Sequence, residues 1–101
     1  MGTYYRRTET KLAAVSSTRL VAITTTDSVK ITLTDGYQGM SISNVGPTVI
    51  AWGGDASLST SSAGLLFYTM EKDFGIVQEG FSVYLIADSA SAKVAVNLYT
   101  V

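Results

Sequence analysis

The stretch that decides the fold is residues 81–100, FSVYLIADSASAKVAVNLYT. Apolar and other side chains alternate along both of its halves, and a polar turn at Asp88–Ser91 separates the halves. The residues expected on one face are Phe81, Val83, Leu85 and Ala87 in the first half and Val94, Val96, Leu98 and Thr100 in the second. Successive side chains of a strand point to opposite faces, so the pattern predicts two strands, each with one buried face.

Similar patterns recur towards the N-terminus. Residues 28–34 and 40–45 alternate, and apolar or β-branched runs occupy residues 20–25, 48–52, 65–69 and 74–77. Asp35-Gly36 and the segment around Pro47 are turn signals. Residues 11–17 fit either a short strand or a turn of helix. About eight short strands without a βαβ rhythm predict an all-β fold, an antiparallel β-sandwich or jelly-roll-like domain.

The length of 101 residues allows one hydrophobic core. We expect an extended N-terminal arm at residues 1–11 and a single β-sandwich domain at residues 12–101. The polar, small-residue stretch at 55–64 is interpreted as a surface loop, because apolar strand-like runs flank it on both sides.

The composition argues against most enzymes. The chain has neither cysteine nor histidine, which removes thiol nucleophiles, disulfides and the usual neutral-pH acid–base group. Hydrophobic residues make up 47% and charged residues 15%, the opposite of a disordered chain. The net charge of −1 lacks the basic excess of a nucleic-acid binder, so no direct nucleic-acid contact is expected.

The N-terminus differs in charge from the rest. Arg6, Arg7, Lys11 and Arg19 stand against only Glu9 in the first twenty residues. No apolar run follows the arginines, so the sequence predicts no secretory signal, and no segment reaches the roughly 18–20 apolar residues of a membrane span. Synthesis in the cytoplasm is therefore expected.

Three segments invite a chemical interpretation. Glu71-Lys72-Asp73 is the densest charged group, but its central lysine favours a solvated surface. The serines at 57–62 have no histidine to activate them, and no Ser-x-x-Lys motif is present. Gly53-Gly54-Asp55 lacks the further glycines and lysine of a phosphate loop. We therefore predict no catalytic residue, no metal ligand and no cofactor.

Two places are predicted to contact partners. Tyr4, Tyr5, Arg6 and Arg7 combine residue types that are enriched at binding hot spots. A frayed terminus is an equally good interpretation of them. Trp52, the single tryptophan, is the other candidate.

Residues 40–101 resemble small β-sandwich virion proteins of tailed bacteriophages. The resemblance rests on an "I-x-N-x-G" strand end at 42–46, a segment from Thr48 to Gly64, a glycine-led strand ending in Ile86-Ala87, and a closing V-x-V-x-x-Y strand at 94–99. The proline-rich stretch that such proteins usually carry before Glu79-Gly80 is missing here. Members of this group are capsid cement or decoration proteins or head–tail accessory proteins, and many are trimers.

The resemblance implies a non-enzymatic structural protein, made in the host cytoplasm and located on the capsid surface. It would be a homotrimer that bridges neighbouring copies of the major capsid protein without covalent bonds. Two alternatives stay open. One is a head–tail connector or tail accessory subunit, which would differ in ring symmetry. The other is a carbohydrate- or receptor-binding module of a tail fibre, for which Trp52, Tyr37 or Tyr68 exposed beside Asp35 and Asp55 would be the signature.

Overall fold

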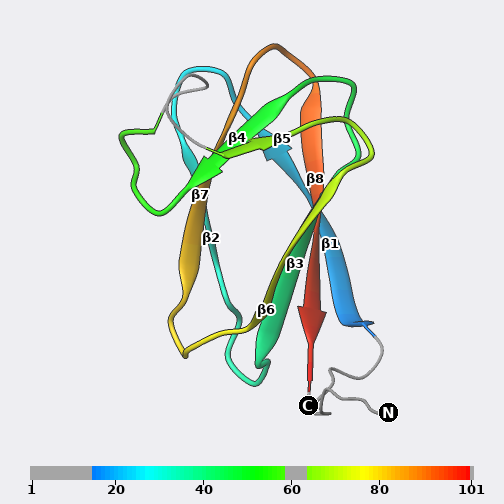
Figure 1. Cartoon of the computed structure of the whole chain (residues 1–101), viewed down its shortest axis with the longest axis vertical. Coiled ribbons are helices and arrows are strands. Elements are labelled where there is room, and N and C mark those ends of the chain that lie inside the picture. The colour runs from blue at the N-terminus through cyan, green and yellow to red at the C-terminus, as the bar shows by residue number, and fades with distance from the viewer. Residues whose placement is uncertain (1–14, 59–63, 101) are drawn as a thin grey trace, which may run out of the picture.

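The computed structural model describes residues 15–58 and 64–100, which form eight strands joined by turns and loops (Figure 1). The strands are β1 (Val15–Ile23), β2 (Val29–Thr32), β3 (Gly39–Asn44), β4 (Ile50–Gly53), β5 (Gly64–Leu66), β6 (Glu71–Ile76), β7 (Ser82–Ala87) and β8 (Ala92–Tyr99). This part of the chain contains no helix that is long and apolar enough to cross a membrane.

The strands form two antiparallel sheets. Sheet A has the order β1-β8-β3-β6 and sheet B the order β2-β7-β4-β5. The first four strands pair with the last four in reverse order, β1 with β8, β2 with β7, β3 with β6 and β4 with β5. Every connection except β4–β5 passes from one sheet to the other. This is the strand order of a jelly roll, a long hairpin wrapped into two sheets, and it confirms the predicted all-β sandwich.

The core lies where the predicted alternation placed it. Val83, Leu85 and Ala87 of β7 point inward and are buried, as are Val94, Val96 and Leu98 of β8. Met40 and Ile42 of β3 and Ile50 of β4 complete the centre of the sandwich. Burial of apolar surface between the two sheets is therefore the main force that fixes the register of each strand.

Two segments differ from the sequence-based expectation. Strand β6 begins at Glu71 rather than Phe74, so the charged group Glu71-Lys72-Asp73 belongs to the strand, where Glu71 and Asp73 are exposed and Lys72 is partly buried. The strand contains a bulge at Gly75, whose φ of 69° favours glycine. The ambiguous segment before Ser17 resolves into strand from Val15 onward. The predicted arm at residues 1–11 and the predicted domain start at residue 12 lie outside the described residues.

A chain of polar contacts crosses the outer face of sheet A. The Thr18 hydroxyl donates to Asn97 Oδ1 at 2.9 Å, and Asn97 Nδ2 donates to the Ser41 hydroxyl at 3.2 Å. Ser41 in turn donates to Glu71 Oε2 at 2.8 Å. These four side chains come from β1, β8, β3 and β6, so the contacts tie together all four strands of the sheet. The result is a cross-braced surface well suited to act as a rigid body.

Candidate contact surface

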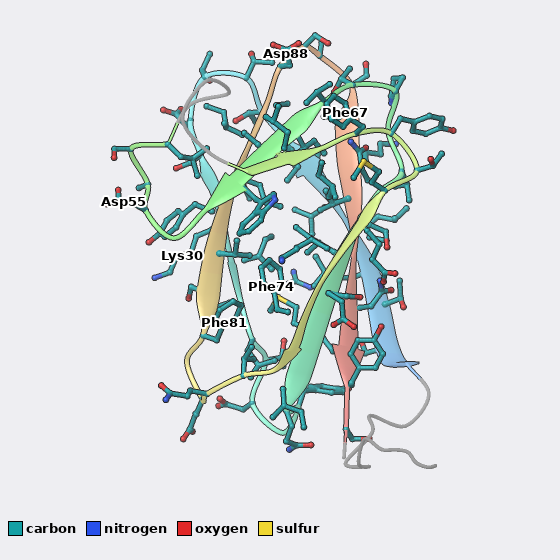
Figure 2. The ribbon with its side chains drawn as sticks, in the orientation of Figure 1. Lys30, Asp55, Phe67, Phe74, Phe81 and Asp88 are labelled. Atoms are coloured by element: carbon teal, nitrogen blue, oxygen red, sulfur yellow. The ribbon has the colours of Figure 1, made fainter. Side chains whose placement is uncertain are left out.

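Exposed apolar side chains gather at the turn that joins β5 to β6. Phe67 is 48% exposed, Tyr68 57% and Met70 45%. The Met70 backbone N–H donates to the Phe67 carbonyl at 2.9 Å and closes a tight turn. Figure 2 shows Phe67 towards the upper end of the sandwich. Large side chains that stay in water here cost free energy that a partner surface would recover.

The neighbouring β3–β4 turn extends this surface. Thr69 donates its N–H to the Asn44 carbonyl at 3.0 Å, and Asn44 donates its own N–H to the Met70 carbonyl at 2.9 Å. These two bonds hold the turns together, so Val45, which is 45% exposed, lies beside the aromatic turn. Leu65 of β5 is 42% exposed. We call the set Val45, Leu65, Phe67, Tyr68 and Met70 the apolar rim.

Thr69 adopts a backbone conformation that β-branched residues rarely take. Its φ is 72°, in the left-handed region, at the third position of the Phe67–Met70 turn. A turn of this kind usually carries glycine or asparagine there. Backbone strain of this sort costs about 1–3 kcal/mol and persists only where the surrounding contacts enforce it. The contacts that enforce it here are the two hydrogen bonds to Asn44.

The buried Asn44 side chain organises this end of the molecule. Its Nδ2 donates to the carbonyls of Thr48, at 2.7 Å, and Leu66, at 2.8 Å, and its Oδ1 accepts from the Gly46 N–H at 3.1 Å. A Cβ on Gly46 would stand 2.7 Å from the Lys93 backbone nitrogen, so only glycine fits. The "I-x-N-x-G" motif therefore fixes the turn, the end of β5 and strand β8 relative to one another.

Trp52, one of the predicted contact residues, lies half-buried against the core. Its ring meets Phe74 edge-on, with centroids 5.6 Å apart, and the Lys72 ammonium lies 5.0 Å from the Trp52 ring centroid. A Cβ on Gly64 would come within 2.5 Å of the ring, so β5 packs directly on it. The other predicted contacts, Tyr4, Tyr5, Arg6 and Arg7, lie outside the described residues.

The β2–β3 and β6–β7 connections lie at the opposite end of the sandwich (Figure 1). Residues of these two connections line a cavity of about 300 Å³. Leu33, Tyr37 and Val77 give it an apolar lining, and Asp35 and Glu79 contribute carboxylates. The structure thus brings Tyr37 and Asp35 together, as one sequence interpretation required, but neither Trp52 nor Asp55 lines this cavity.

Two of the remaining aspartates accept backbone hydrogen bonds that stabilise local turns. Asp55 Oδ1 accepts the Ser57 N–H at 2.8 Å, and this backbone bond, with a smaller contribution from the Ser57 hydroxyl, lowers the pKa of Asp55 below its usual value of 3.8. Asp73 accepts the Gly75 N–H at 2.8 Å at the β6 bulge. Within residues 15–58 and 64–100, no three histidine, cysteine, aspartate or glutamate side chains come together in a way that could hold a metal ion.

Sequence reasoning missed the apolar rim. Leu65–Thr69 was expected to be a short apolar strand, whereas β5 ends at Leu66 and the next residues turn outward. An apolar run of this length does not by itself distinguish a buried strand from an exposed turn.

Comparisons of the chain with protein-family models, with curated proteins and with solved structures found no match.

Proposed function

We propose that the chain is a structural virion protein of a tailed bacteriophage, a cement subunit that bridges neighbouring copies of the major capsid protein at the capsid surface. The observation that carries the proposal is the apolar rim. Five of the seven large hydrophobic side chains that are exposed in the described residues belong to it: four lie on two turns joined by hydrogen bonds, and Leu65 lies on the adjoining strand β5. A surface of this kind functions by contact and requires no reaction.

The physical character of the rim fits a docking surface. Phenylalanine, tyrosine and methionine are enriched in the cores of protein interfaces, while lysine, glutamate and aspartate are depleted there. The Asn44 contacts hold the rim in one conformation before binding. A preorganised surface loses less conformational freedom on association, so more of the energy of apolar burial appears as affinity.

The sequence and the fold support the same proposal by different routes. Histidine and cysteine, the side chains most used in acid–base and thiol catalysis, are absent from the sequence. The jelly-roll strand order is shared by viral capsid proteins and lectins, so it supports the capsid role by analogy. A protein that bridges subunits on a symmetric lattice is expected to be a closed oligomer, and we propose a homotrimer.

Binding to capsids tests this function. Capsids from a phage whose gene for this chain has been deleted are mixed with the purified protein and sedimented. The wild-type chain is expected to sediment with the capsids, and the Phe67→Ser/Met70→Ser variant to remain in solution. Leu20→Ser is the matched control, because Leu20 is 66% exposed but lies on β1, away from the rim. A wild-type chain that stays in the supernatant refutes the capsid role.

Symmetry separates the cement protein from a connector. Native mass spectrometry of the free chain is expected to show a trimer, and averaged images of decorated capsids should show three-fold density on the capsid shell. Density confined to the portal or tail, with ring symmetry, would assign the chain to the connector instead.

A further inference from the structure

The cavity at the lower end of the sandwich has features that the proposed function does not use. Its apolar residues are Leu33, Tyr37 and Val77, and its carboxylates are Asp35 and Glu79. Among the described residues neither carboxylate forms an ion pair or hydrogen bond, and no lysine or arginine lines the cavity. An amphipathic hollow with two solvent-exposed carboxylates and no cation in its lining matches a ligand that carries apolar groups and positive charges together.

The chain itself contains such a ligand. Tyr4-Tyr5-Arg6-Arg7 places two aromatic rings beside two guanidinium groups. Tyrosine rings match the apolar lining, and guanidinium groups match carboxylates in geometry as well as in charge. Residues 15–58 and 64–100 offer no comparable segment, because Arg19, Lys30, Lys72 and Lys93 are each isolated on a strand.

The position of the cavity also suits this segment. Strand β1 begins at Val15, which pairs with Tyr99, and the Tyr99 carbonyl accepts the N–H of Gln38 at the cavity at 2.9 Å. Two strand spacings, about 10 Å, therefore separate Val15 from the cavity wall. Arg7 precedes Val15 by eight residues, which span up to about 26–29 Å when extended. The segment therefore has ample length to reach the cavity of its own subunit.

We propose that Tyr4-Tyr5-Arg6-Arg7 binds in this cavity of the same chain, with the arginines paired to Asp35 and Glu79. Tethering favours the intramolecular contact over one between copies, because the short link gives the segment a high effective concentration at its own cavity. The proposal is independent of the capsid role, since it concerns two parts of one chain. It gives Arg6 and Arg7, which the sequence analysis predicts to be contact residues, an acidic site to bind.

Paramagnetic relaxation in the full-length protein tests the contact. The natural chain has no cysteine, so Gly2→Cys accepts a single nitroxide label. The amide signals of Gly36, Tyr37 and Gly80 are expected to lose most of their intensity, while signals at the apolar rim stay unchanged. Absence of this loss, or an equal loss at the rim, overturns the proposal.

Charge exchange supplies the decisive comparison. Arg6→Glu/Arg7→Glu is expected to restore the signals around the cavity, and adding Asp35→Lys/Glu79→Lys to that variant should broaden them again. A misfolded protein would not regain the contact in this way. Asp55→Lys/Asp88→Lys is the matched control, because Figure 2 shows both aspartates away from the lower end, and it should leave the wild-type broadening intact.

A mixed sample shows which copy supplies the segment. Nitroxide-labelled chain without isotope is combined with ¹⁵N-labelled chain that carries no nitroxide. No broadening is expected at the cavity in this mixture. Broadening there would show an exchange between copies and would contradict the intramolecular contact proposed here.

Discussion

The side chain of Asn44 makes three hydrogen bonds, all of them to backbone groups. Its amide satisfies two carbonyls and one N–H in a site that is 1% exposed. Leucine has a similar volume but supplies none of these bonds. A buried polar group left without a partner costs about 1–3 kcal/mol, so the loss of three partners is severe.

Replacement of Asn44 by leucine should therefore lower the free energy of unfolding by about 3 kcal/mol or more. Chemical denaturation monitored by the fluorescence of Trp52, the single tryptophan, measures the change. Asn97→Ala is the control, because Asn97 is only partly buried and Ser41, to which it donates, keeps its hydrogen bonds to Glu71 and Tyr99. A loss for Asn44→Leu no larger than for Asn97→Ala would contradict this account of the turn.

A substitution at Thr69 is expected to raise the free energy of unfolding rather than lower it. Glycine adopts a φ of 72° without strain, so Thr69→Gly should raise stability by about 0.5–1 kcal/mol after the entropy of the unfolded chain is counted. Thr32→Gly in strand β2 is the matched control and should lower stability. The two midpoints of denaturation decide the matter: if both variants are less stable than the wild type, Thr69 is not strained.

The pKa of Asp55 tests the turn at the end of β4. The Ser57 N–H and hydroxyl both stabilise the ionised carboxylate, which holds the pKa below 3.8. Ser57→Ala removes only the hydroxyl, so the pKa should rise part of the way and remain below the usual value. Because the pKa is lower in the folded state, this contact stabilises the fold above the unfolded-state pKa and loses its effect as the pH falls through the folded-state value. Carboxyl NMR titration measures the shift, and an unchanged pKa in Ser57→Ala would remove the hydroxyl from the explanation.

At the scale of the elements, alternation predicted the strands that have one buried face. The alternation in β2, β7 and β8 could be recognised because core packing selects an apolar residue at every second position. Strand β6 was placed too late because its first three residues are charged. It is an edge strand, paired only with β3. Glu71 and Asp73 are exposed and a lysine stands between them, so the start of the strand carries no apolar period.

Both edges of sheet A carry a cation on the inner face. Arg19 of β1 pairs with Val96, and Lys72 of β6 pairs with Ile42. The side chains of Val96 and Ile42 are both buried in the core. Partners in an antiparallel pair share a face, so these cations face the interior side of the sheet. A charge in that position penalises the addition of another strand at the edge.

Lys72→Val should therefore increase self-association through the β6 edge. The fold is expected to persist, because valine packs well beside Trp52 and Phe74, which the lysine now contacts. Light scattering over a range of concentrations measures the association. Lys93→Val is the control, since Lys93 lies on β8, whose two edges are already paired. Equal association of the two variants would assign the effect to added hydrophobicity alone.

At the scale of the whole molecule, the two ends of the sandwich differ in chemistry. The apolar rim occupies the end where β3 passes to β4 and β5 to β6, and the acidic cavity occupies the other end (Figure 1). The sequence predicted the body between them, because the core pattern is local. Neither surface was predictable, because each joins turns that are distant in sequence and meet only through the jelly-roll topology.

The thermal rupture of capsids tests the central proposal most directly. Capsids that lack the chain are heated with a DNA-binding dye, alone and after addition of the wild-type protein or the rim variant Phe67→Ser/Met70→Ser. The account predicts that the wild type shifts genome release to a higher temperature and that the rim variant does not. Identical release temperatures with and without the wild-type protein would contradict it.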